Sequence, residues 1–93
     1  MELTTIRGDG AAPRDGAGSV AALAGALTEL EARFEAERPE AILLVDDSDT
    51  ALAAALVAAK LLIPIKASGD ATSPASDNAR LIAQLADTYT APS

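Results

Sequence analysis

The chain has 93 residues, a formal net charge of −7 and 49% hydrophobic residues, which fits one small acidic domain spanning residues 1–93. It contains no cysteine and no histidine, so disulfides, thiolate zinc sites, thiol nucleophiles and histidine general bases are excluded. The 14 acidic residues against 7 basic ones argue against binding to nucleic acid or to an anionic membrane surface.

The N-terminal part predicts a short strand and then a flexible loop. Residues 3–7 are rich in β-branched side chains, and residues 11–18 contain proline and glycine without periodicity, so we assign residues 1–18 to these two parts. The polar N-terminus does not resemble a signal peptide, and the longest apolar stretch, 51–65, is too short to span a membrane. We therefore expect a cytoplasmic protein.

The next segment predicts a helix that begins after Ser19, a residue suited to a helix N-cap, and stops at Arg38, because Pro39 follows. Its larger apolar side chains recur at three- and four-residue spacing and form one stripe. They are Val20, Leu23, Leu27, Leu30 and Phe34. The stripe is our candidate surface for a homodimer, and ordinary core packing is the alternative.

Residues 41–45 are apolar throughout, which is typical of a strand buried on both faces in a parallel sheet. An alanine-rich helix is predicted from Asp49 to Leu62, and small side chains there allow close packing on a sheet. Ile63 to Lys66 predicts a short strand, with the proline near its beginning.

The C-terminal part predicts a polar loop over residues 67–75, a helix capped by Ser76 or Asp77, and a last strand over residues 88–91. Strands and helices thus alternate in the order β-α-β-α-β-α-β, which indicates right-handed crossovers and a parallel sheet. We expect an α/β fold, a small Rossmann-like three-layer unit with a mainly parallel sheet of about four strands.

An acidic turn follows the strand at residues 41–45 and contains Asp46, Asp47, Ser48, Asp49 and Thr50. Open α/β sheets bind ligands at the carboxyl ends of their strands, where helix N-termini offer free N–H groups. A purely structural role is the alternative, in which Ser48 or Asp49 caps the helix and the acids favour its dipole.

Two more specific interpretations of this turn, a metal site and a receiver domain, have less support from the sequence. Asp47 and Asp49 have the D-x-D spacing that can hold a divalent ion, but this tripeptide is unspecific, and we predict no metal and no cofactor. Residues 42–49 also resemble the start of a two-component receiver domain. A receiver domain also needs a phosphoacceptor Asp farther along the chain, followed by a Thr or Ser and a Lys. Here the last acid is Asp87 and no lysine follows Lys66, so the chain does not fit a receiver domain.

The region 19–93 resembles the N-terminal domain of the UDP-N-acetylglucosamine 2-epimerases. The stretch RPEAILLVDDSDTALAAALVAAKLLIPI, residues 38–65, is similar to the family's Pro-Asp, hydrophobic strand, His-Gly-Asp-Thr-Thr, Ala/Leu-rich helix and Ile-Pro-Val. The stretch DNARLIAQLADTYTAPS, residues 77–93, is similar to its Glu-Glu-x-Asn-Arg helix, short strand and Ala-Pro-Thr. The resemblance implies the family's α/β fold.

The same resemblance implies that Asp47 matches the family's strand-end Asp, a candidate for acid/base catalysis. Ser76 stands where the family has a third acid, and Asp77 matches the neighbouring Glu. The family's Glu after Ile-Pro-Val has no counterpart in residues 66–70. Because epimerisation needs several acids with different pKa values, one matching carboxylate implies a chain that is not an active epimerase.

We therefore expect a non-catalytic, epimerase-like module that self-associates, as a homodimer, or serves as an accessory partner in sugar-nucleotide metabolism. The alternative is a protein that binds a UDP-sugar or another small anion, or a residual epimerase. Besides Asp47, the candidate ligand-binding residues are Asp46, Ser48, Asp49, Thr50, Lys66, Ser68, Asp77 and Arg80.

Overall fold

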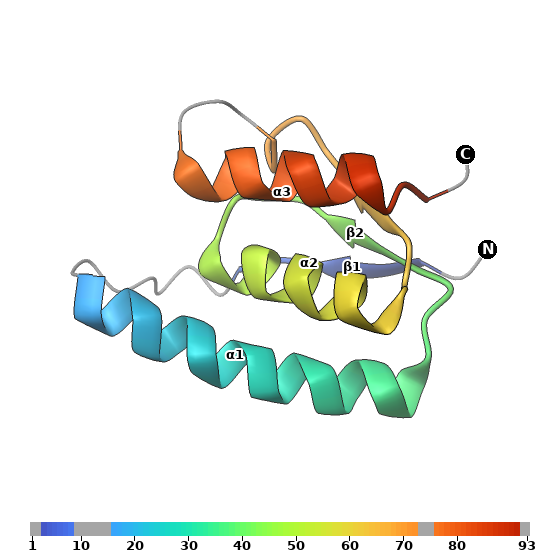
Figure 1. Ribbon diagram of the computed structural model, residues 1–93, viewed down its shortest axis with the longest axis horizontal. Coiled ribbons are helices and arrows are strands. Elements are labelled where there is room, and N and C mark those ends of the chain that lie inside the picture. The colour runs from blue at the N-terminus through green and yellow to red at the C-terminus, as the bar shows by residue number, and fades with distance from the viewer. Residues whose placement is uncertain (1–2, 9–15, 73–75, 92–93) are drawn as a thin grey trace.

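The computed structural model describes residues 3–8, 16–72 and 76–91 and contains three strands and three helices (Figure 1). In chain order these are β1 (Leu3–Ile6), α1 (Gly16–Glu37), β2 (Ala41–Leu44), α2 (Asp49–Leu61), β3 (Ile65–Ala67) and α3 (Asp77–Thr88). Within these residues, no helix has both the length and the apolar character needed to cross a bilayer.

The sheet is parallel with strand order β1-β2-β3, so β2 lies in the centre. Register places Ile6 opposite Leu44 on β2, and Ile42 of β2 opposite Ile65 on β3. All four of these side chains are buried. The predicted α/β class and parallel sheet are thereby confirmed.

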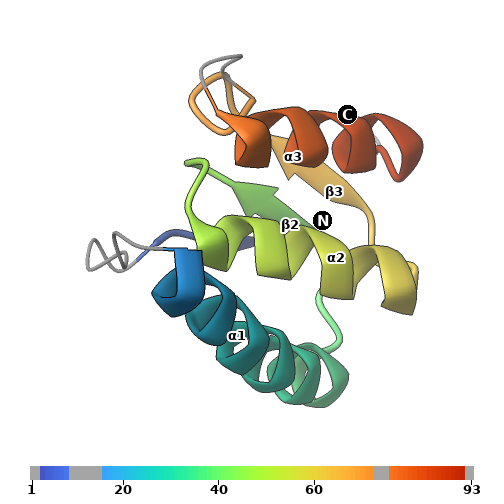
Figure 2. The ribbon, with the colours of Figure 1, turned by 60° about the vertical axis from the view of Figure 1, so that its left-hand side comes forward.

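The three helices form a single layer on one face of this sheet (Figures 1 and 2). Helix α2 contacts all three strands, while α1 and α3 pack against its two sides. Each crossover leads to the next strand in the same direction, and right-handed crossovers of this kind place α1 and α2 on the same face. Among the described residues, the other face lacks a helix layer, so the expected three layers are reduced to two.

The core lies between α2 and the sheet. Five large side chains in it are less than 2% exposed: Phe34, Ile42, Leu44, Ile65 and Ile82. Helix α2 contributes five fully buried alanines, Ala51, Ala53, Ala54, Ala55 and Ala58. Their small side chains allow the central helix to approach the sheet and both neighbouring helices at once, which explains its composition.

Helix α1 begins at Gly16, so the predicted start after Ser19 is wrong by four residues, and residues 16–18 are not loop. A helix extends cheaply once formed, and the alanines nearby have high helix propensity. Residues 11–15 of the predicted loop lie outside the described residues. The predicted stop is confirmed, because Arg38 adopts a φ of 50° and its N–H donates to the Phe34 carbonyl at 2.8 Å.

The predicted fourth strand is not confirmed. Helix α3 extends to Thr88, and only Thr90 forms a bridge, a parallel one with Ile65. The Ile65 N–H donates to the Tyr89 carbonyl at 2.7 Å, and the Ala91 N–H donates to the Ile65 carbonyl at 3.1 Å. Strand β3 also begins later than predicted, at Ile65, because the preceding Pro64 has no N–H to donate.

Candidate functional site

The acidic turn after β2 lies in a group of loops at the carboxyl ends of the strands. Parallel strands end at the same edge of a sheet, so Gly8 after β1 and Ser68 after β3 flank the turn. The Val45 N–H donates to the Ile6 carbonyl at 3.3 Å, and the Ser68 N–H donates to the Leu44 carbonyl at 2.9 Å. The edge predicted to carry the site is therefore formed by contacts between all three strands.

Asp46 links the loops that follow β1 and β2. Its Oδ2 accepts from the Gly8 N–H at 2.9 Å, while its Oδ1 accepts from the Ser48 N–H at 3.1 Å and from Ser48 Oγ at 2.6 Å. Both carboxylate oxygens are thus engaged within the chain. This geometry holds the Gly8 backbone against the turn.

The environment of Asp46 lowers the pKa of its carboxyl below the ordinary aspartate value. Partial burial raises the pKa, but the hydrogen bonds from Ser48 and Gly8 favour the charged form and outweigh burial. The positive charge of Arg7 acts in the same direction. The carboxylate is therefore stabilised in its ionised state, as a structural acceptor rather than a proton donor.

We predict that this carboxylate stabilises the fold above about pH 4 and that its contribution disappears at lower pH. A folded pKa below the unfolded value of about 3.9 gives stability that is lost as the pH falls through the folded pKa. In urea unfolding at neutral pH, Asp46→Asn should lower the free energy of unfolding by about 1–2 kcal/mol. The difference from the unsubstituted protein should shrink in acid.

Asp70→Asn is the matched control, because Asp70 is an exposed loop aspartate. It should leave the free energy of unfolding unchanged at both pH values. A constant difference between Asp46→Asn and the unsubstituted protein down to pH 2 would contradict the role assigned to Asp46.

Two serines cap the helices that begin at this edge. Ser48 Oγ accepts from the Ala51 N–H at 3.1 Å at the start of α2, and Ser76 Oγ accepts from the Ala79 N–H at 3.0 Å at the start of α3. Both residues have the extended backbone of an N-cap. The N-cap of α2 is therefore Ser48 and not Asp49, and the N-cap of α3 is Ser76 and not Asp77.

Asp47 and Asp49 are bound to the first turn of α3. Ser76 Oγ donates to Asp47 Oδ2 at 2.6 Å, and Asn78 Nδ2 donates to the Asp47 carbonyl at 3.1 Å and to Asp49 Oδ1 at 2.9 Å. These bonds join the β2–α2 turn to α3. Ser76 and Asn78 are not among the site residues predicted from the sequence, although a polar residue at the start of a helix at this edge is a usable signal.

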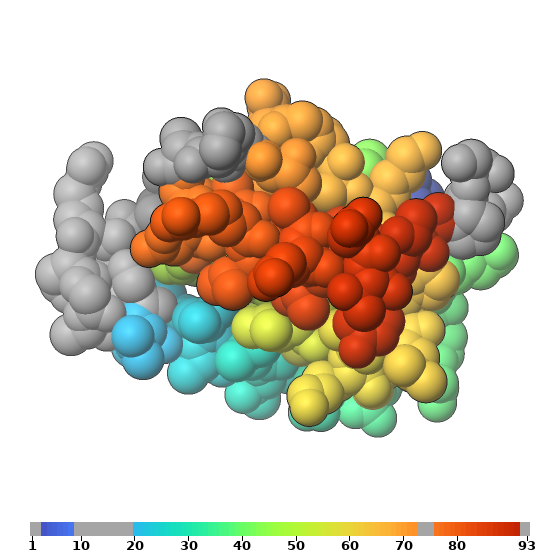
Figure 3. Space-filling model, turned by 45° about the horizontal axis from the view of Figure 1, so that its top comes forward, coloured from blue at the N-terminus to red at the C-terminus, as the bar shows by residue number. Residues whose placement is uncertain are grey.

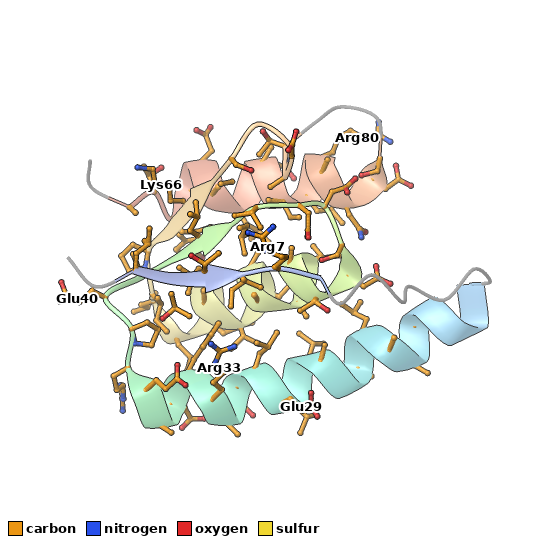
Figure 4. The ribbon with its side chains drawn as sticks, turned by 180° about the vertical axis from the view of Figure 1, so that it is seen from behind. Arg7, Glu29, Arg33, Glu40, Lys66 and Arg80 are labelled. Atoms are coloured by element: carbon orange, nitrogen blue, oxygen red, sulfur yellow. The ribbon has the colours of Figure 1, made fainter. Side chains whose placement is uncertain are left out.

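The remaining candidate residues are not gathered there. Lys66 lies in β3 opposite Leu43, and Figure 4 shows it far from Arg80. Arg80 pairs with Asp77 on the exposed surface of α3. Thr50 is half-buried in the first turn of α2. The side chains of Asp46, Ser48 and Asp49 thus lie with that of Asp47 in one cluster of hydrogen-bonded side chains. Lys66 and the Asp77–Arg80 pair lie outside this cluster.

Among the described candidate residues, Ser68 is the one with a buried side-chain oxygen, Oγ, that lacks a hydrogen-bond partner. The hollows elsewhere include one of about 590 Å³ between β3 and α3 and one of about 380 Å³ between α1 and α2. Within the described ranges, no group of three acidic side chains is arranged to hold a metal ion.

Chemically, this cluster caps two helices and joins three loops. Its three carboxylates act as hydrogen-bond acceptors for Gly8, Ser48, Ser76 and Asn78. Comparison of the chain with protein families, curated proteins and solved structures gives no match.

Proposed function

We propose that the chain is a non-catalytic module that acts by self-association, as a homodimer. The observation that carries this proposal is the hollow of about 380 Å³ between α1 and α2. Most of its lining is aliphatic, and its two walls carry one acid and one base. The lining residues are Leu27, Thr28, Glu31, Leu56, Val57, Lys60 and Leu61.

The apolar stripe of α1 divides into two parts at this hollow. Leu30 and Phe34 are buried in the core, so packing explains the C-terminal half of the stripe. Val20 is 67% exposed, and Leu27 lines the hollow. Figure 3 shows α1, α2 and α3 side by side on this surface. Only the N-terminal half of the stripe is available to a partner, which narrows the predicted dimer surface.

Opposite charges on one patch favour a second copy of this chain as the partner. A two-fold interface uses the same patch on both copies. The α1 side of one copy then faces the α2 side of the other, which brings the acid of each copy toward the base of its partner. Glu31 on α1 and Lys60 on α2 then pair across the interface, twice per dimer. The aliphatic lining supplies the apolar area, and Leu56, 36% exposed, is its centre.

The engagement of the carboxylates supports a non-catalytic role. A general acid or base must reach the substrate proton, whereas Asp47 Oδ2 already accepts a 2.6 Å bond from Ser76. The connection to the UDP-N-acetylglucosamine 2-epimerase family and to sugar-nucleotide metabolism enters here as part of the proposal. It rests on the sequence resemblance of residues 38–65 and 77–93 alone.

Charge exchange across the hollow tests the dimer. We expect sedimentation equilibrium in the micromolar range to show a dimer, and Glu31→Lys or Lys60→Glu to weaken it about tenfold each. Each single change replaces two attractive contacts by two repulsive ones. The double variant restores opposite charges and should recover most of the affinity.

Glu29→Lys is the matched control, since it makes the same charge change on the same helix outside the hollow. It should leave the dimer unaffected. Circular dichroism establishes that each variant is folded. A strict monomer at all concentrations, or a double variant as weak as the sum of its single changes, would refute this dimer.

Binding of a small anion is the second candidate function, and the buried, unpaired Ser68 Oγ favours it. Amide shifts on titration with UDP and UDP-N-acetylglucosamine would test it. Shifts centred on Asp47 and Ser68 would support a ligand site at the strand ends, whereas an unchanged spectrum would leave self-association as the function. Loss of the shifts in an Asp47→Asn variant whose free energy of unfolding is unchanged would assign the binding site to this turn.

A further inference from the structure

The uncovered face of the sheet has a regular composition. Register and the alternation along each strand place seven described residues on it: Leu3, Thr5, Arg7, Ala41, Leu43, Val45 and Lys66. Figure 4 looks onto this face and shows Arg7 and Lys66 apart from one another. An all-parallel sheet usually has both faces covered, commonly by helices. The composition of the face then indicates what could cover it.

This face carries partly exposed aliphatic side chains and two cations. Leu43 of β2 and Val45, which follows β2, are half-buried on this face, Ala41 is fully buried, and β1 adds Leu3, which is 39% exposed. Arg7 follows β1, and its side chain lies between β1 and β2 in Figure 4, whereas Lys66 lies on β3; both are exposed. Within the part of the chain that the structure describes, no acid lies within 4.0 Å of either charge to form an ion pair.

This charge contrasts with the rest of the chain. The protein has a net charge of −7, and α1 alone carries Glu29, Glu31, Glu35 and Glu37 on exposed positions. On the uncovered face the strand positions carry two cations and no acid. A second copy placed face to face would bring these cations together, so this face does not suit the homodimer.

We propose that this sheet face binds an amphipathic helix of another protein, with an aliphatic stripe and acidic flanks. Three strands spaced about 4.8 Å apart give a surface about one helix diameter wide. The aliphatic stripe lies over Leu43 and Val45, and the acidic flanks reach Arg7 and Lys66. Because exposed ion pairs are short-range at physiological salt, the net charge of the chain opposes this contact only weakly.

Two synthetic peptides of the same leucine pattern test the proposal, one flanked by glutamates and one by lysines. We expect the glutamate peptide to shift amides of β1, β2 and β3 and to bind at least tenfold more tightly than the lysine peptide. Lys66→Glu should weaken the glutamate peptide about fivefold. Arg7→Glu should do the same, although Lys66→Glu is the cleaner variant because Arg7 also acts on Asp46.

Arg80→Glu is the control, because it makes the same charge change on the exposed surface of α3. It should leave peptide binding unchanged. Equal binding of both peptides, shifts confined to the α1–α2 hollow, or no binding of either peptide would overturn the proposal. The dimer is tested on the opposite surface, so failure of one proposal does not decide the other.

Discussion

Replacing Phe34 by alanine is expected to lower the free energy of unfolding by about 4 kcal/mol, a large part of the total for a domain of this size. Phe34 is the largest fully buried side chain, with an exposed fraction of 0%. It anchors α1, in which none of the side chains of residues 20–27 is fully buried. Loss of the ring leaves a cavity that the small alanines of α2 cannot fill. Urea denaturation followed by circular dichroism measures the change.

Val20→Ala in the same helix is the control. It distinguishes the loss of a buried side chain from a change in helix propensity as the cause of a lower free energy of unfolding. Val20 is 67% exposed, so its truncation removes little packing and should change the free energy of unfolding by less than about 0.5 kcal/mol. A comparable loss for both variants would show that α1 is not held by Phe34. Full unfolding of Phe34→Ala without denaturant agrees with the expected effect, and Phe34→Leu then gives a measurable intermediate value.

Replacing Gly8 by alanine should destabilise the protein by about 2–3 kcal/mol, through a clash at the acidic turn. A Cβ at this position would lie 2.6 Å from the Ser48 Cβ and 2.7 Å from its Oγ. To relieve this contact, the loop after β1 must move away from the turn. That movement would also break the bond from the Gly8 N–H to Asp46.

Gly25→Ala is the control for a glycine without such a contact. A Cβ at Gly25 meets nothing within 4 Å, and the residue lies exposed inside α1. Alanine should therefore stabilise the helix by about 0.5–1 kcal/mol. Equal stability of Gly8→Ala and the unsubstituted protein would show that the loop adapts freely. The role of Asp46 as a link between two loops would then be wrong.

These expectations bear on function, because they assign the acidic turn to the architecture of the fold. The same residues that suggest chemistry in the sequence hold α2, α3 and the β1 loop together. A substitution at Asp46 or Asp47 thus changes stability as well as any ligand binding. Binding experiments on such variants need a parallel measurement of unfolding.

The sequence by itself determined the features that depend on neighbouring residues. The apolar run at residues 41–45 predicted a strand buried on both faces; β2 forms there, but the described helices cover only one of its faces. The sequence predicted both helix starts to within one residue, at Ser48 or Asp49 and at Ser76 or Asp77, because an N-cap bond spans only three residues; the structure assigns both caps to the serines. Pro39 identified the end of α1 for a similarly local reason.

Only the tertiary structure decided which residues meet across the fold. Asp46 bonds to Gly8, 38 residues away, and Asp47 bonds to Ser76, 29 residues away. No periodicity reports such contacts, because they depend on how strands are ordered in the sheet. The strand order likewise placed every described helix on one face and reduced the last strand to the bridge at Thr90. The uncovered sheet face and the α1–α2 hollow follow from that packing, which the chain acquires only on folding.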